Sequence, residues 1–210
     1  MSEGLVIAVD GPAASGKSTL ARRLAEHYGL PFLDTGLLYR AVARRLQRRG
    51  SDASDAAVAA EEARKLAPDD LAGADLAGEL LGRIASQIAA YPAVREALLP
   101  FQRAFGRDGP GAVLAGRDIG TVVRPDATVK IFITASVEER ARRRHDELRR
   151  RGDAPIYAVV LEELRERDRR DQERAVAPLR AASDAWVVDT TELDVDAAFA
   201  AARRHVDAMR

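Results

Sequence analysis

Apolar and polar positions along this chain follow the patterns of strands and helices. Five short apolar runs predict buried strands, and they span residues 5–10, 31–34, 112–116, 129–135 and 185–190. Helices are expected at residues 17–28, 36–49, 137–151 and 156–174, and from about Asp194 to the end of the chain. Strands that alternate with helices predict an α/β fold with a parallel sheet covered on both faces.

The middle of the chain has a different pattern. Residues 51–90 are rich in alanine, with leucine and isoleucine near helical spacing, so helices are expected there with a loop around Pro68 to Gly73. A further helix is expected from Pro92 to about Gly106. We expect it to kink or end at Pro100, because proline has no N–H to donate within a helix.

Composition limits the classes of protein that fit. A chain of 210 residues that is 47% hydrophobic can bury one substantial core, so a single domain over residues 1–210 is expected. Thirty-three basic residues balance thirty-three acidic ones, which argues against a general binder of nucleic acid polymers. The absence of cysteine excludes disulfides, thiolate metal ligands and a cysteine nucleophile.

The apolar runs also bear on location. No run approaches the roughly 20 apolar residues that span a membrane, and the first run lacks the preceding basic residues of a signal peptide. We therefore expect a cytoplasmic protein without a membrane partner. We also expect a monomer, without a nucleic acid polymer as partner.

The stretch GPAASGKST follows the first predicted strand and fits the phosphate-loop spacing G-x-x-x-x-G-K-[ST]. Backbone N–H groups of such a loop and the start of the next helix favour phosphate oxygens. Lys17 would bridge the β- and γ-phosphates of ATP, and Ser18 would give its hydroxyl to Mg²⁺. The predicted ATP-binding residues are Gly11, Pro12, Ala13, Ala14, Ser15, Gly16, Lys17, Ser18 and Thr19.

A phosphate loop alone is shared by motors, GTPases, ATP-driven binding proteins and small kinases. A GTPase would need a base-reading N-K-x-D element, and this chain contains no asparagine. Arg117 and Asp118 instead follow the third strand, at the sheet edge where open parallel sheets bind ligands. Alone, these two residues could equally be an ion pair in a loop.

Two arginine-rich segments lie further along the chain. Arg167, Asp171 and Arg174 share one helical face at spacing i, i+4, i+7, whereas the neighbouring arginines 165, 169 and 170 fit a solvated face. Residues 139–152 hold seven arginines beside a glycine, and such density repels itself unless an anion is present. We therefore expect a mobile arginine lid at about 140–156 that closes over the triphosphate.

Several motifs occur in the order typical of one family. They are VDGPAASGKST, LDTGLLYRAVA, ASQIAAYPAVREALL, GRDIGTVVRPDATVKIFITAS with EERARRR, and ERDRRDQERAVAPL followed by DAWVVDTT. The sequence resembles bacterial cytidylate kinases, which are relatives of the adenylate kinase group. The resemblance covers nearly the whole chain and is more specific than the phosphate loop alone.

The resemblance implies a P-loop NTPase fold with a five-stranded parallel sheet in the order 2-3-1-4-5. It implies a core of residues 1–35, 107–139 and 157–210, with a helical acceptor-binding subdomain at about 36–106. It also implies transfer of phosphate from ATP to CMP or dCMP with Mg²⁺.

The resemblance assigns the acceptor site residue by residue. Thr35, Arg95, Asp118 and Arg174 would surround cytosine, Ser86, Arg167 and Asp171 would hold the ribose, and Arg40 and Arg117 would grip the acceptor phosphate. Lys17, Arg117, Arg140 and Arg144 would stabilise the charge on the transferred group as catalytic residues.

Other interpretations remain for these positions. Thr35 could cap a helix, Ser86 could bond its own backbone, and Arg40 and Arg95 could be surface arginines. Longer family members insert a small antiparallel sheet where residues 51–85 look short and helical. A shikimate-type small-molecule kinase and a non-catalytic ATP-dependent module are the alternative functions.

Overall fold

The computed structural model describes residues 4–71, 76, 78–107 and 109–210. The chain forms two compact units, of which the first comprises Met1–Leu33 and Gly106–Arg210 and the second Asp34–Phe105. The predicted division into a core, an acceptor-binding subdomain and a lid is a functional assignment and stays a prediction.

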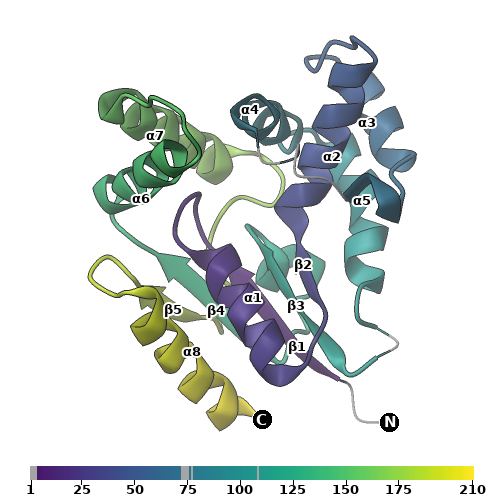
Figure 1. Ribbon diagram of the computed structural model, residues 1–210. Helices are drawn as coiled ribbons and strands as arrows, with labels where there is room; N and C mark the ends of the chain where they lie inside the picture. The colour runs from purple at the N-terminus through teal and green to yellow at the C-terminus, as the bar shows by residue number, and fades with distance from the viewer. Residues whose placement is uncertain (1–3, 72–75, 77, 108) are drawn as a thin grey trace. The chain divides into compact units, whose positions relative to one another are not determined.

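The sheet has five strands in the order β2-β3-β1-β4-β5 (Figure 1), as expected. The strands are β1 (Leu5–Asp10), β2 (Phe32–Asp34), β3 (Gly111–Gly116), β4 (Val129–Thr134) and β5 (Trp186–Asp189). Strand β1 pairs in parallel with β3 and β4, and β4 pairs in parallel with β5. Every strand end lies within one residue of its predicted position.

The register of β1 and β3 decides where chemistry can occur. Asp10, the last residue of β1, lies opposite Gly116, the last residue of β3. The phosphate loop begins at the next residue of one strand, and Arg117 follows directly on the other. Both segments therefore leave the sheet side by side at its carboxyl edge, which is where open parallel sheets bind ligands.

The helices of the first unit are α1 (Lys17–Tyr28), α6 (Val137–Arg150), α7 (Tyr157–Glu173) and α8 (Val195–Met209). Leu20 and Leu24 of α1 and Val206 of α8 pack with the apolar side chains of the central strands, so α1 and α8 cover the same face of the sheet (Figure 1). A short π-helix, η3 (Ile119–Val123), follows β3 and was not predicted.

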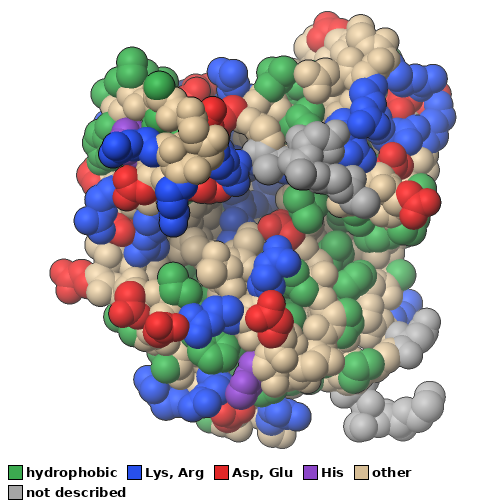
Figure 2. All heavy atoms as spheres, viewed as in Figure 1, with side chains coloured by type: hydrophobic (Ala, Val, Ile, Leu, Met, Phe, Trp, Pro, Cys, Tyr) green, Lys and Arg blue, Asp and Glu red, His purple; other side chains and the backbone are tan. Residues whose placement is uncertain are grey.

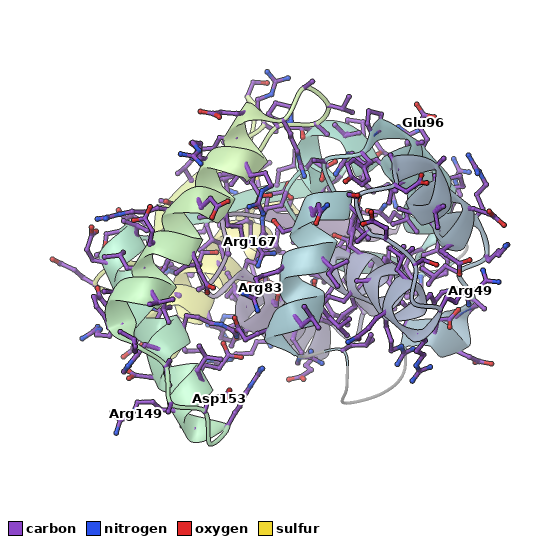
Figure 3. The ribbon with its side chains drawn as sticks, turned by 90° about the horizontal axis from the view of Figure 1, so that it is seen from above. Arg49, Arg83, Glu96, Arg149, Asp153 and Arg167 are labelled. Carbon is purple, nitrogen blue, oxygen red and sulfur yellow. The ribbon has the colours of Figure 1, made fainter. Side chains whose placement is uncertain are left out.

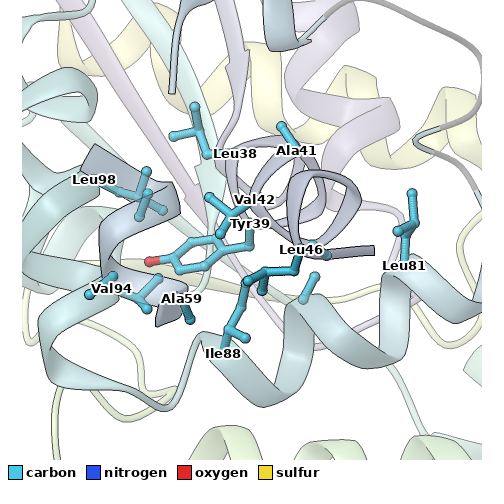
Figure 4. Close-up of a cluster of buried hydrophobic side chains, with 14 of the residues drawn as sticks. Leu38, Tyr39, Ala41, Val42, Leu46, Ala59, Leu81, Ile88, Val94 and Leu98 are labelled. Carbon is cyan, nitrogen blue, oxygen red and sulfur yellow. The ribbon is translucent and has the colours of Figure 1, made fainter. Parts of the chain in front are cut away.

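The second unit is helical. Its elements are α2 (Thr35–Arg48), α3 (Ala56–Arg64), the 3-10 helix η1 (Pro68–Leu71), α4 (Glu79–Ile88) and α5 (Pro92–Ala104). Leu38, Leu46, Ile88 and Leu98 are fully buried in its core (Figure 4). Helices in the alanine-rich segment are thus confirmed. The predicted loop begins instead with η1, and Ala72 and Gly73 lie outside the described residues.

Helix α5 corrects one expectation. It continues past Pro100 to Ala104, so the prediction that it could end at the proline is wrong. Proline removes one bond, to the carbonyl four residues earlier. Both Pro100 and Glu96 are exposed, so water can take the place of the lost donor.

Polar side chains cap four of the helices. Asp34 accepts from the N–H of Gly36 at the start of α2, and Asp55 caps α3 in the same way. Ser136 accepts from the N–H of Glu139 at the start of α6, and Asp194 caps α8. Each cap satisfies a donor that the first helical turn leaves open.

Candidate active site

The phosphate loop joins β1 to α1. Gly11 and Gly16 both have positive φ, 156° and 87°, and Gly16 is the N-cap of α1. A Cβ on Gly11 would lie 2.2 Å from the carbonyl oxygen of Ile133, so only glycine fits there. The loop therefore turns sharply beside β4 and leads directly into the N-terminus of α1, the kind of helix end that favours anions.

The predicted phosphate-binding side chains sit at the start of α1. Lys17 is buried, and its Nζ donates to the carbonyl of Pro12 at 3.5 Å. Ser18 is half-buried and Thr19 is exposed. A lysine folded back on its own loop and a hydroxyl on the first turn suit the triphosphate and its Mg²⁺.

The described residues offer no metal site built from protein side chains alone. Where the structure describes side chains, no group of three or more His, Asp or Glu residues could hold a metal ion. Mg²⁺ characteristically binds through one or two protein oxygens together with substrate phosphates and water. The half-buried hydroxyl of Ser18 fits that mode of binding.

Arg140 lies at the base of α6 and contacts the phosphate loop. Its Nη1 donates to the carbonyl of Ala13 at 3.2 Å, and its Nε donates to the carbonyl of Ala135 at 3.0 Å. Asp168 of α7 binds the same guanidinium in a bidentate ion pair, at 3.1 and 2.6 Å. Arg140 is thus buried and multiply bonded, and its predicted contact with the transferred phosphate stays a prediction.

The other arginines of the predicted lid are largely paired with carboxylates. Glu139 pairs with Arg142 and Arg143, and Glu147 pairs with Arg144 and Arg151. Figure 2 shows basic and acidic side chains intermingled over α6 and α7. These ion pairs relieve much of the self-repulsion expected of the segment, so its composition alone does not require an anion.

The outer end of the α6–α7 hairpin differs from its base. Arg149 and Asp153 lie at the outer tip of the hairpin, whereas Arg167 lies on α7 well away from that tip (Figure 3). Arg165 and Arg170 pair with neighbouring glutamates, as a solvated face predicts. The sequence spacing therefore separated the inward and outward faces of α7 correctly.

The end of β3 meets the inward face of α7. Arg117 Nε contacts Asp171 Oδ2 at 2.9 Å, and Arg174 Nη2 lies 3.5 Å from Asp118 Oδ1. All four side chains are largely buried. The structure thus brings four of the predicted site residues of the first unit together in two ion pairs, and Arg117 pairs with Asp171 rather than with Asp118.

The charges of this cluster act on Asp171. Burial alone would raise the pKa of its carboxyl, but the guanidinium groups of Arg117, Arg167 and Arg174 outweigh burial and hold that pKa below its ordinary value. Asp171 is therefore ionised at neutral pH and can accept hydrogen bonds from ligand hydroxyls.

Asp10 is a functional candidate that sequence reasoning missed. Its two carboxylate oxygens accept from the backbone N–H groups of Ile119 and Gly120, both at 2.8 Å. Burial raises the pKa of Asp10 from 3.8 to about 6, against the lowering effect of these two bonds. The residue immediately before the phosphate loop thus fixes the segment that follows Arg117 and Asp118.

A signal for Asp10 was present in the sequence. It is the single charged residue that ends the apolar run LVIAVD, and a carboxylate there needs a partner. Asp168 gave no comparable signal, because its partner Arg140 is 28 positions away and both lie within arginine-rich helices.

In the second unit, Arg40 is half-buried on α2. Its Nη1 donates to the carbonyls of Leu76 and Gly78, at 2.8 and 2.9 Å. A Cβ on Gly82 of α4 would lie 2.8 Å from Arg40 Nη2, so this glycine leaves room for the guanidinium. Arg40 is thus held against α4 rather than extended as a surface arginine.

Thr35, Ser86 and Arg95 are all buried. Thr35 is the first residue of α2, whose cap is Asp34, so the interpretation of Thr35 as the helix cap is wrong. Arg95 donates to the carbonyl of Ala89 and lies over the ring of Tyr39, 5.9 Å from its centroid. Its burial excludes the surface interpretation, and the predicted roles of all three residues stay predictions.

The sequence model of the family described as "Cytidylate kinase" matches residues 7–206. The chain belongs to the cytidylate kinase family. Cytidylate kinases of Paramagnetospirillum magneticum and Methylocella silvestris are 58% and 60% identical to it over 200 and 199 residues, covering 94% of this chain in both cases and 95% and 92% of theirs. That of Rhizobium meliloti is 53% identical over 206 residues, or 97% of this chain and 96% of its own.

Solved structures agree with this membership at the level of the fold. An uncharacterized protein from Eubacterium ventriosum superposes with a TM-score of 0.58 at 16% identity, covering 97% of this chain and 98% of its own. A gluconokinase from Sinorhizobium meliloti gives 0.50 at 17% identity, covering 100% and 97%. The cytidylate kinase family member described here therefore has the P-loop kinase fold. None of its described helices is both long and apolar enough to cross a membrane.

Proposed function

We propose that this protein transfers the γ-phosphate of ATP to CMP or dCMP, giving ADP and CDP or dCDP. Membership of the cytidylate kinase family supports the proposal. The observation that carries it is the presence of two buried ion pairs, Arg117–Asp171 and Arg174–Asp118. They lie next to the phosphate loop at the carboxyl edge of the sheet. An enzyme that transferred phosphate to water or to an uncharged acceptor would not need them.

The acceptor is bound by groups of complementary charge. Arg117 and Arg40 bind its phosphate, since a guanidinium group stays charged and can donate two hydrogen bonds to the phosphate oxygens at once. Asp171 and Arg167, with Ser86, hold the ribose. Thr35, Arg95, Asp118 and Arg174 surround the base. The two ion pairs hold Arg117, Asp171, Arg174 and Asp118 in place before the acceptor arrives, which lowers the entropic cost of binding.

Asp118 supplies the base selectivity in this proposal. Its carboxylate accepts a hydrogen bond from the amino group of cytosine. Uracil presents a carbonyl oxygen at the same position, and two acceptors facing each other in a buried site are unfavourable. CMP and dCMP should therefore bind better than UMP.

The transfer itself needs positioning and charge stabilisation. An oxygen of the acceptor phosphate attacks the γ-phosphorus in line, and the bond from that phosphorus to the bridging oxygen breaks, leaving both electrons on ADP. No side chain has to remove a proton, because the attacking oxygen is already anionic. Lys17 and Arg117 stabilise the charge on the transferred group, with Arg140 and Arg144 as the further candidates.

Mg²⁺ would supply further charge neutralisation when bound between the phosphates and the Ser18 hydroxyl. We also propose that the enzyme works in the cytoplasm as a monomer, and sedimentation at increasing protein concentration would test the oligomeric state.

A substrate panel tests the reaction. ADP release is followed with ATP, Mg²⁺ and, in separate assays, CMP, dCMP, UMP, AMP or shikimate. Turnover with CMP and dCMP far above the others is expected. Strong turnover with UMP or AMP but not CMP would contradict the base assignment, turnover with shikimate would indicate a small-molecule kinase, and ADP release indifferent to every acceptor would indicate a non-catalytic module.

Asp118→Ala tests the base contact, with Asp126→Ala as its control. Asp126 is exposed and pairs locally with Arg124. Asp118→Ala should raise the KM for CMP and reduce the preference for CMP over UMP by roughly tenfold or more, since one base contact gives about 1–3 kcal/mol of discrimination. The affinity for ATP should stay nearly unchanged. An equal loss of both affinities would mean that Asp118 is structural.

A further inference from the structure

The phosphate loop holds a residue in an unfavourable backbone conformation. Ala14 has φ 58°, in the left-handed region that a residue with a Cβ rarely adopts. Such a conformation persists only where surrounding contacts impose it. The backbone conformation of the loop that should bind the phosphates of ATP is therefore not favoured by its own residues. Contacts from neighbouring elements have to stabilise it.

Those contacts come from the α6–α7 hairpin. Ala13, directly before Ala14, is buried against Ala141 of α6 and Leu164 of α7, and Ala14 packs on the same cluster. The carbonyl of Ala13 accepts from Arg140 Nη1 at 3.2 Å. Both the apolar side chain and the polar backbone of residue 13 are thus fixed by the hairpin.

Arg140 can donate to the Ala13 carbonyl because an ion pair with Asp168 orients its guanidinium. The two carboxylate oxygens of Asp168 bind both terminal nitrogens of the guanidinium, and the carbonyl of Ala135 binds its Nε. The side chains of both partners are largely buried, with exposed fractions of 6% and 14%. In a planar guanidinium, contacts to all three nitrogens fix the direction of the remaining N–H bonds.

On the other side of Ala14, the carbonyl of Ser15 accepts from the Thr190 hydroxyl at 3.4 Å. Thr190 follows β5 and is itself bonded by Arg143 of α6, whose Nη2 donates to its carbonyl at 2.5 Å. The carbonyls on both sides of the strained residue are therefore connected to α6.

We propose that Asp168 and Arg140 are positioning residues for the ATP site, and that they impose the phosphate-binding shape of the loop through the Ala13 carbonyl. This inference rests on the proposed function, because it assigns the loop to ATP. It differs from a direct contact of Arg140 with the transferred phosphate, because in the described arrangement the guanidinium acts on the protein backbone.

The substitution Asp168→Asn separates these two roles. Asparagine keeps the size of the side chain but removes its charge and one acceptor oxygen, which loosens Arg140 while leaving its positive charge in place. A positioning role predicts weaker ATP binding, since the loop loses its support. A direct role predicts unchanged or tighter ATP binding, since a released arginine would be freer to reach the phosphates.

Glu62→Gln is the matched control. Glu62 is buried in the second unit, and its carboxylate pairs with Arg45 at 3.0 Å and with Arg49. This variant also breaks a buried ion pair, but one without contact to the phosphate loop. It should lower the free energy of unfolding and leave the affinity for Mg²⁺·ATP unchanged.

The measurements are the Kd of Mg²⁺·ATP by calorimetry and the KM of CMP from steady-state kinetics. For Asp168→Asn, the Kd should rise about tenfold, equivalent to about 1.4 kcal/mol, while the KM of CMP changes less than about twofold. An unchanged or lower Kd, or an equal rise in Glu62→Gln, would overturn the proposal.

Two further results keep the test decisive. If Asp168→Asn does not fold, Arg140→Lys retains the charge but loses the planar fork, and its Kd for Mg²⁺·ATP should rise with little change in the KM of CMP. A Kd unchanged in Arg140→Lys would overturn the proposal as well. If the wild-type protein binds ATP but does not phosphorylate CMP, the proposed function is refuted. The positioning role of Asp168 and Arg140 at the ATP site would still stand.

Discussion

Burial of Asp10 predicts a pH dependence of stability that one substitution should remove. The carboxyl accepts two backbone hydrogen bonds but lies at the end of a buried strand, and burial raises its pKa from 3.8 to about 6. In the unfolded chain the pKa returns to its ordinary value. Between these two values, the folded protein binds a proton that the unfolded protein does not.

The sign and size follow from proton linkage. Stability falls with rising pH wherever the folded state binds more protons. The contribution of Asp10 is therefore fully present below about pH 4 and is lost as the pH rises through about 6. A difference of roughly two pKa units, at about 1.4 kcal/mol per unit, amounts to about 3 kcal/mol.

Urea unfolding of wild type and Asp10→Asn between about pH 4 and pH 8 measures this contribution. The other carboxyl groups titrate alike in both proteins, so the difference between the two curves isolates Asp10. The Asp10→Asn variant should be less stable than wild type at low pH, because the amide nitrogen of asparagine faces a backbone donor. The difference in the free energy of unfolding between the two proteins should narrow by about 3 kcal/mol as the pH rises. If the free energies of unfolding of the two proteins changed with pH in parallel, the reasoning would be refuted. A difference that widened with rising pH would mean that the pKa of Asp10 is lowered on folding rather than raised.

Three further substitutions test other parts of the structure. Gly11→Ala places a Cβ 2.2 Å from a carbonyl of β4, so ATP binding measured by calorimetry should weaken at least about tenfold; unchanged affinity would mean that the loop can shift freely. Gly82→Ala places a Cβ 2.8 Å from Arg40, so the KM of CMP should rise about fivefold while that of ATP stays constant; a shift in both would argue against a role for Arg40 at the acceptor. Asp171→Asn leaves Arg117 buried beside a neutral partner, so the free energy of unfolding should fall by about 3 kcal/mol in chemical denaturation; a loss below about 1 kcal/mol would mean that water screens the pair.

Local pattern was sufficient for most of the fold. The strands are apolar and bounded by glycine, proline or polar residues, so their positions follow from residues within a short window. The π-helix at Ile119–Val123 could not be predicted in this way. Its backbone is fixed by Asp10, more than a hundred positions earlier in the chain, and a local pattern does not contain that contact.

The same distinction applies to the site. Helical spacing placed Arg167 and Asp171 on one face of α7, whereas Arg174 is the C-cap just beyond the helix, and the strand ending at Gly116 placed Arg117 at the ligand-binding edge. Which arginine pairs with which carboxylate depended on how α7 packs against that edge. Spacing along a helix indicates which residues lie on the same side of it, but not which residues of other elements they contact.

The pairing of the arginines in α6 has a consequence for how the nucleotide is captured. The helix carries six arginines and four carboxylates, and Glu139 and Glu147 each neutralise neighbouring guanidinium groups. With an excess of only two arginines over carboxylates, the helix projects a weak field beyond the roughly 8–10 Å over which salt screens charges. ATP should therefore associate at a rate that changes little with ionic strength, because short-range fit rather than electrostatic steering brings it into the loop.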